Sequence, residues 1–196
     1  MKRLVFLILL LSVPAVFAQP AQIILIRHAE KPDDKDDPHL TAKGREHARA
    51  LVNYVTHTPE LLTNGTPAAL FATHATAHDR SLRPHETLEP LAKELKLKIQ
   101  TPVLAKDYAA LAKQILGNRK FQGRTVLICW THTEITQLAA ALGVKPEPKE
   151  WKAGDFDRVL LISYHDGKAG LSELNQKLSA DSTLDKKSAA DLRQPR

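Results

Sequence analysis

The sequence has a single cysteine, no apolar run as long as a typical membrane span and no stripe of basic residues, and each absence narrows the possible functions. Because Cys129 is alone, the chain can form no intrachain disulfide and no metal site built on cysteines. The apolar stretch from Leu4 to Ala18 is short for a membrane-spanning helix. Basic residues are dispersed among acidic ones without interleaved aromatic side chains, so nothing in the sequence indicates binding to nucleic acid.

The N-terminus has the composition of a secretory signal peptide. Lys2 and Arg3 form a basic start, residues 4–11 are unbroken apolar sequence, and Val16-Phe17-Ala18 is a cleavage pattern of small residues. We predict that residues 1–18 are removed as a signal peptide and that the protein is exported, to the periplasm or out of the cell. After cleavage it would have no membrane attachment. An uncleaved N-terminal anchor is the alternative.

Residues 19–175 are predicted to form one domain with one core, because their number is typical of a single domain. Residues 176–196 are polar, rich in Ser, Asp, Lys and Ala, and lack an apolar stripe, so we predict a mobile tail there. Removal of Lys2 and Arg3 lowers the formal net charge from +6 to +4, which is compatible with an anionic substrate. No pattern in the sequence indicates an oligomeric state.

Apolar runs alternate with amphipathic patterns along the predicted domain. A continuous apolar run predicts a buried strand, and apolar residues at i, i+3, i+4 and i+7 predict a helix. The expected strands are residues 22–26, 69–73, 98–101, 125–130, 158–164 and 169–174. The expected helices carry their apolar faces at residues 48–55, 88–95, 108–115 and 135–142, and Pro90 is expected to kink the second or shift its start. The alternation predicts an α/β fold, a three-layer sandwich with a mostly parallel central sheet.

Polar side chains of the same kinds follow three of the expected strands. Arg27 and His28 come directly after the first, residues 74–83 follow the second, and His132 comes soon after the strand that ends at Trp130. Ligands bind beyond the carboxyl ends of the strands in such sheets. Arginine has a planar fork of donors that fits a phosphate, and histidine can act as a nucleophile near neutral pH. Their convergence predicts phosphoryl chemistry.

With these residues the chain resembles the histidine phosphatase superfamily, also called phosphoglycerate-mutase-like proteins. The motifs that carry the resemblance are Arg27-His28-Ala29-Glu30, Leu40-Thr41 with Gly44 and Ala48, Arg83 with Glu86 and Thr87, and His132 after an apolar strand. The resemblance spans residues 23–162, which is nearly the whole predicted domain. An Arg-His pair alone is a weak signal, whereas the ordered combination is specific.

The resemblance implies a phosphoric monoester hydrolase that needs no metal or other cofactor. His28 would be the nucleophile that takes the phosphoryl group, and Arg27, Arg83 and His132 would hold the phosphate oxygens. Arg80 lies on the same segment as Arg83 and could replace or join it in the pocket. The partner would be a small phosphorylated substrate or a phosphoprotein.

The general acid that protonates the leaving group is not identified by a motif. Thr133 stands where one branch of the superfamily, the acid phosphatases and phytases, has an aspartate directly after the second histidine. Asp107 is the first candidate because smaller members place a glutamate in the corresponding segment, and Glu134 and Glu30 are alternatives. The role needs a carboxylic acid within hydrogen-bond reach of the leaving oxygen.

Three other functions compete with this interpretation. The chain could be a non-catalytic module that binds a phosphate ligand on the same fold. It could be a metal-binding protein, because His74, His78, Asp79 and His85 lie close together in the sequence and are ligand types for zinc. A mutase acting on a phosphorylated three-carbon acid is the third, and the predicted export counts against it.

Overall fold

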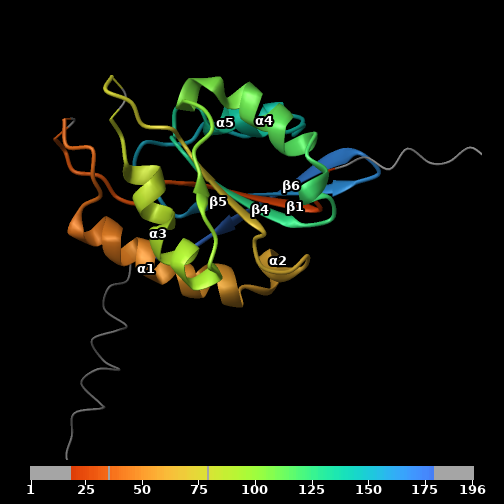
Figure 1. The fold of residues 1–196 in the computed structure, drawn as a ribbon, viewed down its shortest axis with the longest axis horizontal. Coiled ribbons are helices and arrows are strands. Elements are labelled where there is room, and N and C mark those ends of the chain that lie inside the picture. The colour runs from red at the N-terminus through yellow and green to blue at the C-terminus, as the bar shows by residue number, and fades with distance from the viewer. Residues whose placement is uncertain (1–18, 35, 79, 179–196) are drawn as a thin grey trace, which may run out of the picture.

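The computed structural model describes residues 19–178 apart from residues 35 and 79. Their strands form a six-stranded sheet in the order β3-β2-β4-β1-β5-β6, with helices on both faces (Figure 1). The strands are β1 (Gln22–Arg27), β2 (Ala69–Ala72), β3 (Ile99–Gln100), β4 (Thr125–Trp130), β5 (Arg158–His165) and β6 (Lys168–Asn175). The helices are α1 (Ala42–His57), α2 (Pro59–Leu62), α3 (Arg83–Leu95), α4 (Tyr108–Leu116) and α5 (Ile135–Ala141), with 3-10 turns η1 (Ala105–Asp107) and η2 (Arg119–Phe121). The predicted three-layer α/β architecture is confirmed.

The sheet is mostly parallel, as predicted. β1 pairs in parallel with β4, with Arg27 opposite Trp130, and β2 is parallel to both β4 and β3. β5 and β6 are antiparallel and are joined by the predicted hairpin at Asp166 and Gly167, which have φ values of 50° and 76°. The carboxyl ends of β1, β2 and β4 therefore lie at one edge of the sheet, where the polar segments begin.

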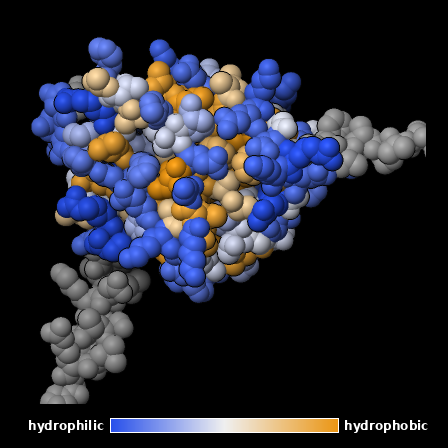
Figure 2. Space-filling model, viewed as in Figure 1, coloured by the Kyte–Doolittle hydropathy of each residue, from blue (hydrophilic) through white to orange (hydrophobic). Residues whose placement is uncertain are grey.

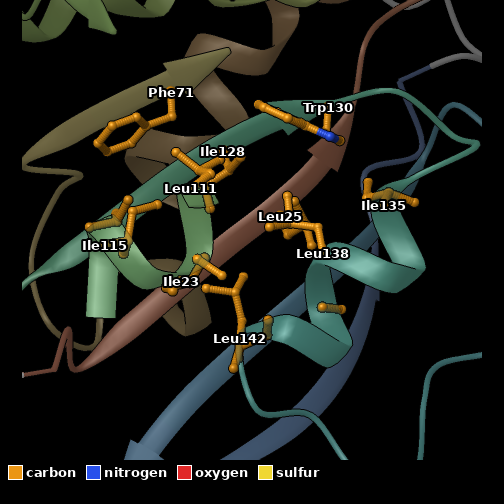
Figure 3. Close-up of a cluster of buried hydrophobic side chains, with 14 of the residues drawn as sticks. Ile23, Leu25, Phe71, Leu111, Ile115, Ile128, Trp130, Ile135, Leu138 and Leu142 are labelled. Atoms are coloured by element: carbon orange, nitrogen blue, oxygen red, sulfur yellow. The ribbon is translucent and has the colours of Figure 1, made fainter. Parts of the chain in front are cut away.

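The core lies on both faces of the sheet because alternate side chains of each strand point to opposite sides. On β1, Ile23 and Leu25 join the cluster under α4 and α5, whereas Ile24 and Ile26 join the cluster under α1 and α3. Figure 3 shows the first cluster, in which Leu138 of α5 packs toward Leu25. The strands are buried on both faces, which explains why their sequences are continuous apolar runs.

Of the two effects expected of Pro90, the structure excludes a shift of the start of helix α3. The proline lies inside the helix, which begins at Arg83 and continues to Leu95, so Pro90 does not set its start. Proline lacks the N–H that would donate to the carbonyl of Glu86 one turn earlier. The helix tolerates this loss because its buried face, with Leu88 and Leu91 fully enclosed, packs against the sheet.

The ends of the domain differ in part from the predicted boundaries. Gln176 is buried and its backbone N–H donates to the carbonyl of Asp157 over 2.8 Å, and the N–H of Leu178 donates to the Asp157 carboxylate over 2.8 Å. The packed domain therefore continues at least to Leu178, past the predicted boundary at residue 175. The predicted signal peptide and the rest of the predicted tail lie outside the described residues.

The surface of the described residues is polar over most of the face in Figure 2, with hydrophobic side chains in small groups between the hydrophilic ones. Among the described residues, the one large hydrophobic residue that is exposed is Leu82, at 38%. It lies directly before α3. Within the described ranges, no helix combines the length and the apolar character that a membrane crossing requires.

Gly44 allows helix α1 to approach the loop that leaves β1. The N–H of Thr41, which caps the helix, donates to the carbonyl of Glu30 over 3.0 Å, and the Thr41 hydroxyl accepts from the N–H of Gly44 over 2.9 Å. A Cβ at position 44 would lie 2.3 Å from the carbonyl oxygen of Glu30. Glycine is therefore the residue that this backbone contact requires.

We expect Gly44→Ala to destabilise the fold by about 1 to 3 kcal/mol, because overpacking against a fixed backbone shifts the chain. Gly154→Ala is the matched control, since a Cβ there meets nothing within 4 Å. Urea denaturation followed by circular dichroism measures both. Equal unfolding midpoints for the two variants would contradict the close contact at position 44.

Candidate active site

Two neighbouring parallel strands carry the paired histidines of the site. Arg27 is the last residue of β1 and lies opposite Trp130, the last residue of β4, so the segments with His28 and His132 leave the sheet side by side. The N–H of His28 donates to the carbonyl of Trp130 over 3.2 Å. The backbone pairing of β1 and β4 thus continues one residue past the end of β1, which keeps the segments that carry His28 and His132 next to each other.

His28 is held in one tautomer. Its ring Nδ1 lies 2.7 Å from the carbonyl oxygen of Ala29, and because a carbonyl can only accept, Nδ1 carries the proton and donates. Burial, together with the nearby charges of Arg27, Arg83 and His132, lowers the pKa of His28 to about 3, although the hydrogen bond to Ala29 acts in the opposite direction. At neutral pH the ring is therefore neutral, with the lone pair on Nε2, which is the form that a nucleophile needs.

Arg27 is a buried cation, and one of its three guanidinium nitrogens has hydrogen-bond partners among the described residues. Its side chain is 1% exposed. Nη1 donates to the carbonyl oxygens of Lys152, Ala153 and Asp155, with distances of 3.4 Å to Lys152 and 3.3 Å to Asp155. We call these three carbonyls the Arg27 cradle. The other nitrogens, Nε and Nη2, are buried and find no hydrogen-bond partner among the described residues.

Buried donors without partners are costly, so they identify a place where an acceptor belongs. Burial lowers the pKa of Arg27 to about 10, while the nearby charge of Asp155 acts in the opposite direction. The guanidinium is still charged at neutral pH. An anion next to Nε and Nη2 would satisfy both donors at once, in the bidentate geometry that arginine makes with phosphate.

Arg83, the first residue of α3, is tied to the loop before α1. Its Nε donates to the carbonyl of His39 over 3.3 Å and its Nη2 donates to the carbonyl of Asp37. Its positive charge lowers the pKa of both Arg27 and His28. The remaining guanidinium nitrogen of Arg83, Nη1, can donate to other acceptors. The charge of Arg83 also acts on His28.

Thr87 links the nucleophile loop to helix α3. Its hydroxyl accepts from the N–H of Ala29 over 2.9 Å and donates to the carbonyl of Arg83 over 2.8 Å. The Thr87 side chain therefore links Ala29, the residue after His28, to Arg83, the second arginine of the site. These two bonds explain why Arg83 and Thr87 occur together in the sequence motif.

His132 is half-buried beside the nucleophile. Burial lowers its pKa, and the charges of Arg27 and Lys31 lower it further, while Glu134 acts in the opposite direction. The Glu134 carboxylate also accepts hydrogen bonds from the hydroxyls of Thr131 and Thr133, the two neighbours of His132. Glu134 thus stabilises the loop that presents the second histidine.

The other predicted residues are placed differently. Arg80 is exposed, and its Nη2 lies 3.9 Å from the carboxylate of Asp36, which is more exposed still. Asp107 is exposed at the N-terminus of α4, where its side chain makes no capping hydrogen bond. The carbonyl of Ala105, in the same turn η1, accepts from Nε1 of Trp130 over 3.1 Å, which fixes this segment next to the end of β4.

Glu30 is engaged in a buried ion pair that the sequence did not indicate. Its Oε2 lies 3.0 Å from Nδ1 of His47, and Lys43 Nζ lies 3.7 Å from Oε1. Nε2 of His47 donates to Gln176 Oε1 over 3.1 Å. Hydrogen bonding to His47 and its charge lower the pKa of Glu30 although burial opposes this, so Glu30 is a carboxylate that does not readily supply a proton.

The histidines proposed as metal ligands do not gather in the structure. Within the described parts of residues 19–178, no three His, Cys, Asp or Glu side chains are grouped so as to hold a metal ion. The ring of His85 lies 3.2 Å from the Glu89 carboxylate one helical turn away, and His78 is exposed in the loop after β2. Asp79, which belongs to the same predicted cluster, lies outside the described residues.

Sequence reasoning missed the segment from Trp151 to Phe156. It supplies the Arg27 cradle, and the ring of Phe156 stacks on the Arg27 guanidinium with its centroid 4.0 Å from the central carbon. The same ring lies 6.2 Å from the His28 ring, centroid to centroid. Backbone carbonyls have no sequence signature, and two aromatic residues in a polar stretch were the available signal.

No protein-family model and no curated protein matches the sequence, whereas comparison with solved structures finds similar folds. A mycobacterial glucosyl-3-phosphoglycerate phosphatase in complex with inorganic phosphate has a TM-score of 0.53, 14% identity, and coverage of 82% of this chain and 100% of its own. A phosphoserine phosphatase mutant from Entamoeba histolytica, in complex with phosphoserine, has a TM-score of 0.55, 12% identity, and coverage of 82% and 99%.

These similarities define the fold of the chain. It is an α/β protein whose polar residues gather at the carboxyl edge of a mostly parallel sheet. More narrowly, it has the fold of these two solved phosphatases, and the predicted α/β fold is confirmed.

Proposed function

We propose that the protein is a phosphomonoesterase that works through a phosphohistidine intermediate at His28. The observation that carries the proposal is the pairing of a neutral, tautomerically fixed His28 with a buried Arg27 whose Nε and Nη2 find no partner among the described residues. A nucleophile and two buried donors that suit an anion thus occupy neighbouring positions. The similar solved structures are named as phosphatases, one with inorganic phosphate and one with phosphoserine, which supports a phosphomonoester substrate.

In the first step, the lone pair on Nε2 of His28 forms a bond to phosphorus while the bond from phosphorus to the leaving oxygen breaks. The leaving oxygen takes a proton from a carboxylic acid. The Nδ1–H of the phosphorylated ring still donates to the Ala29 carbonyl, which stabilises the positive charge that the ring acquires. In the second step, water attacks phosphorus, gives its proton to the carboxylate, and releases inorganic phosphate and neutral His28.

The cationic groups lower the barrier because a phosphoryl group in transfer spreads negative charge over its equatorial oxygens. Arg27, Arg83 and His132 provide donors and positive charge that are in place before reaction. Their charge takes the part that a metal ion plays in other phosphoryl-transfer enzymes, so the mechanism does not require a metal. We propose that the substrate is a small phosphorylated molecule or a phosphoprotein. We also propose that the protein is exported, to the periplasm or out of the cell.

The test is a panel of aryl phosphates, sugar phosphates and phosphoproteins assayed with the protein from residue 19 onward, with and without exhaustive chelation. We expect hydrolysis that survives chelation and an acid-labile, base-stable phosphoryl label on histidine after rapid quenching. Binding of phosphate without turnover of any ester would support the non-catalytic module instead. Activity lost on chelation and restored by a divalent ion would contradict the metal-independent mechanism.

Asp107 remains our candidate for the general acid, because turn η1 lies next to the end of β4 and Glu30 is held as a carboxylate by His47. We expect Asp107→Asn to slow alkyl phosphates by about 100-fold, and 4-nitrophenyl phosphate only a few-fold, since a good leaving group needs no proton. Glu134→Gln is the matched comparison. If Asp107→Asn slows both substrates equally, or Glu134→Gln produces the selective loss, Asp107 is not the acid.

A further inference from the structure

The segment from Trp151 to Phe156 determines how Arg27 faces the site. All three cradle carbonyls accept from a single nitrogen of the guanidinium, Nη1. A guanidinium is planar, so one anchored nitrogen still leaves its plane free to rotate about the anchored bond. The ring of Phe156, 4.0 Å from the guanidinium carbon, fixes that plane.

The segment is itself stiff. Trp151 is buried in the core, and its Nε1 donates to the Asp155 carbonyl, which also accepts from Arg27, over 2.8 Å. The Asp155 carboxylate accepts from the N–H groups of Asp157 and Arg158 over 3.2 and 3.1 Å. Hydrogen bonds within the segment and to the start of β5 therefore hold this turn independently of its contacts with Arg27.

We propose that Phe156 is a positioning residue for the phosphate site and acts through Arg27. The stacked ring and the cradle together fix the guanidinium of Arg27, whose Nε and Nη2 find no partner among the described residues, and the same ring lies 6.2 Å from the His28 ring. Phe156 is half-buried and lies in a loop, so packing in the core does not account for an aromatic residue here. This inference rests on the proposed function, because it assumes that Arg27 binds a phosphoryl oxygen.

The test is the binding of inorganic phosphate by isothermal titration calorimetry, which does not depend on turnover. We expect Phe156→Leu, which keeps apolar bulk but removes the ring, to weaken phosphate binding about tenfold, the loss of a partly buried cation–π contact. Phe156→Tyr keeps the ring and should bind phosphate nearly as the parent does. Phe156→Met is a second ring-free variant in case Phe156→Leu does not fold.

A double-mutant cycle separates positioning from general structure. In the Arg27→Gln background, Phe156→Leu should have no further effect on phosphate binding, because no guanidinium remains to be oriented. An equal loss in both backgrounds, or no loss from Phe156→Leu or Phe156→Met in the parent, would overturn the positioning role. If the parent itself binds no phosphate, the proposed function fails. If the parent binds phosphate but the Phe156 variants give one of the contrary results above, the positioning role alone fails.

Discussion

His28→Ala is expected to lower kcat for an aryl phosphate by at least about 1,000-fold, the scale on which an enzyme loses rate when its nucleophile is removed. The reason is specific to this site. The ring carries its proton on Nδ1 and has a pKa of about 3, so Nε2 is free to attack throughout the neutral range. Alanine offers no nitrogen in place of Nε2.

The control for this variant is His57→Ala. His57 is exposed in the last turn of α1, so its removal should leave both rate and stability near those of the parent. Rapid quenching after mixing with labelled substrate should give a phosphoryl label on the parent and on His57→Ala, and none on His28→Ala. Hydrolysis by His28→Ala at the parent's rate would end the phosphohistidine proposal.

The sheet could be predicted because each of its central strands is a continuous apolar run. β1 and β4 are buried on both faces, so their sequences contain almost no polar residue before the strand ends. The hairpin of β5 and β6 was predictable from Asp166-Gly167, whose positive φ values suit a tight turn. The strand order was not predictable, because it depends on contacts between elements far apart in the chain.

The two histidines of the site could also be found from the sequence, since His28 and His132 follow β1 and β4 within two positions. The partners of Arg27 could not. The Arg27 cradle lies more than a hundred residues along the chain and acts through backbone carbonyls, which any residue type can supply. Sequence also could not separate Arg83 from Arg80, whereas the charge of Arg83 acts on His28 and Arg80 pairs with an exposed carboxylate.

Glu30 illustrates a second limit. As a carboxylic acid beside the nucleophile it was a reasonable candidate for the general acid. The fold instead places His47 of α1 and Gln176 after β6 behind it, and this buried chain of hydrogen bonds keeps the carboxylate ionised. The contact joins residues separated by 17 and 129 positions, so no local pattern could reveal it.

Replacement of Arg27 should have the second large effect that we expect, because this side chain both anchors the cradle segment and provides the donors that we propose for phosphate. Nη1 donates to the cradle, and Nε and Nη2, which find no partner among the described residues, are the donors that we propose for phosphate. Arg27→Gln should lower kcat/KM by about 100- to 1,000-fold, as loss of a preorganised donor does in other enzymes. It should also lower the free energy of unfolding by about 1 to 3 kcal/mol, because the cradle carbonyls lose a charged donor.

Arg27→Lys separates the two roles. A lysine ammonium is a compact charge without a planar fork, so it can reach the cradle or the phosphate but cannot serve both with the same geometry. We therefore expect Arg27→Lys to recover part of the stability and little of kcat/KM, measured by urea denaturation and by steady-state kinetics on one aryl phosphate. Arg49→Gln, an exposed change on α1, is the control for lost charge. Full activity in Arg27→Lys would show that charge alone is needed, and that the fork held between the cradle and Phe156 has no part in binding phosphate.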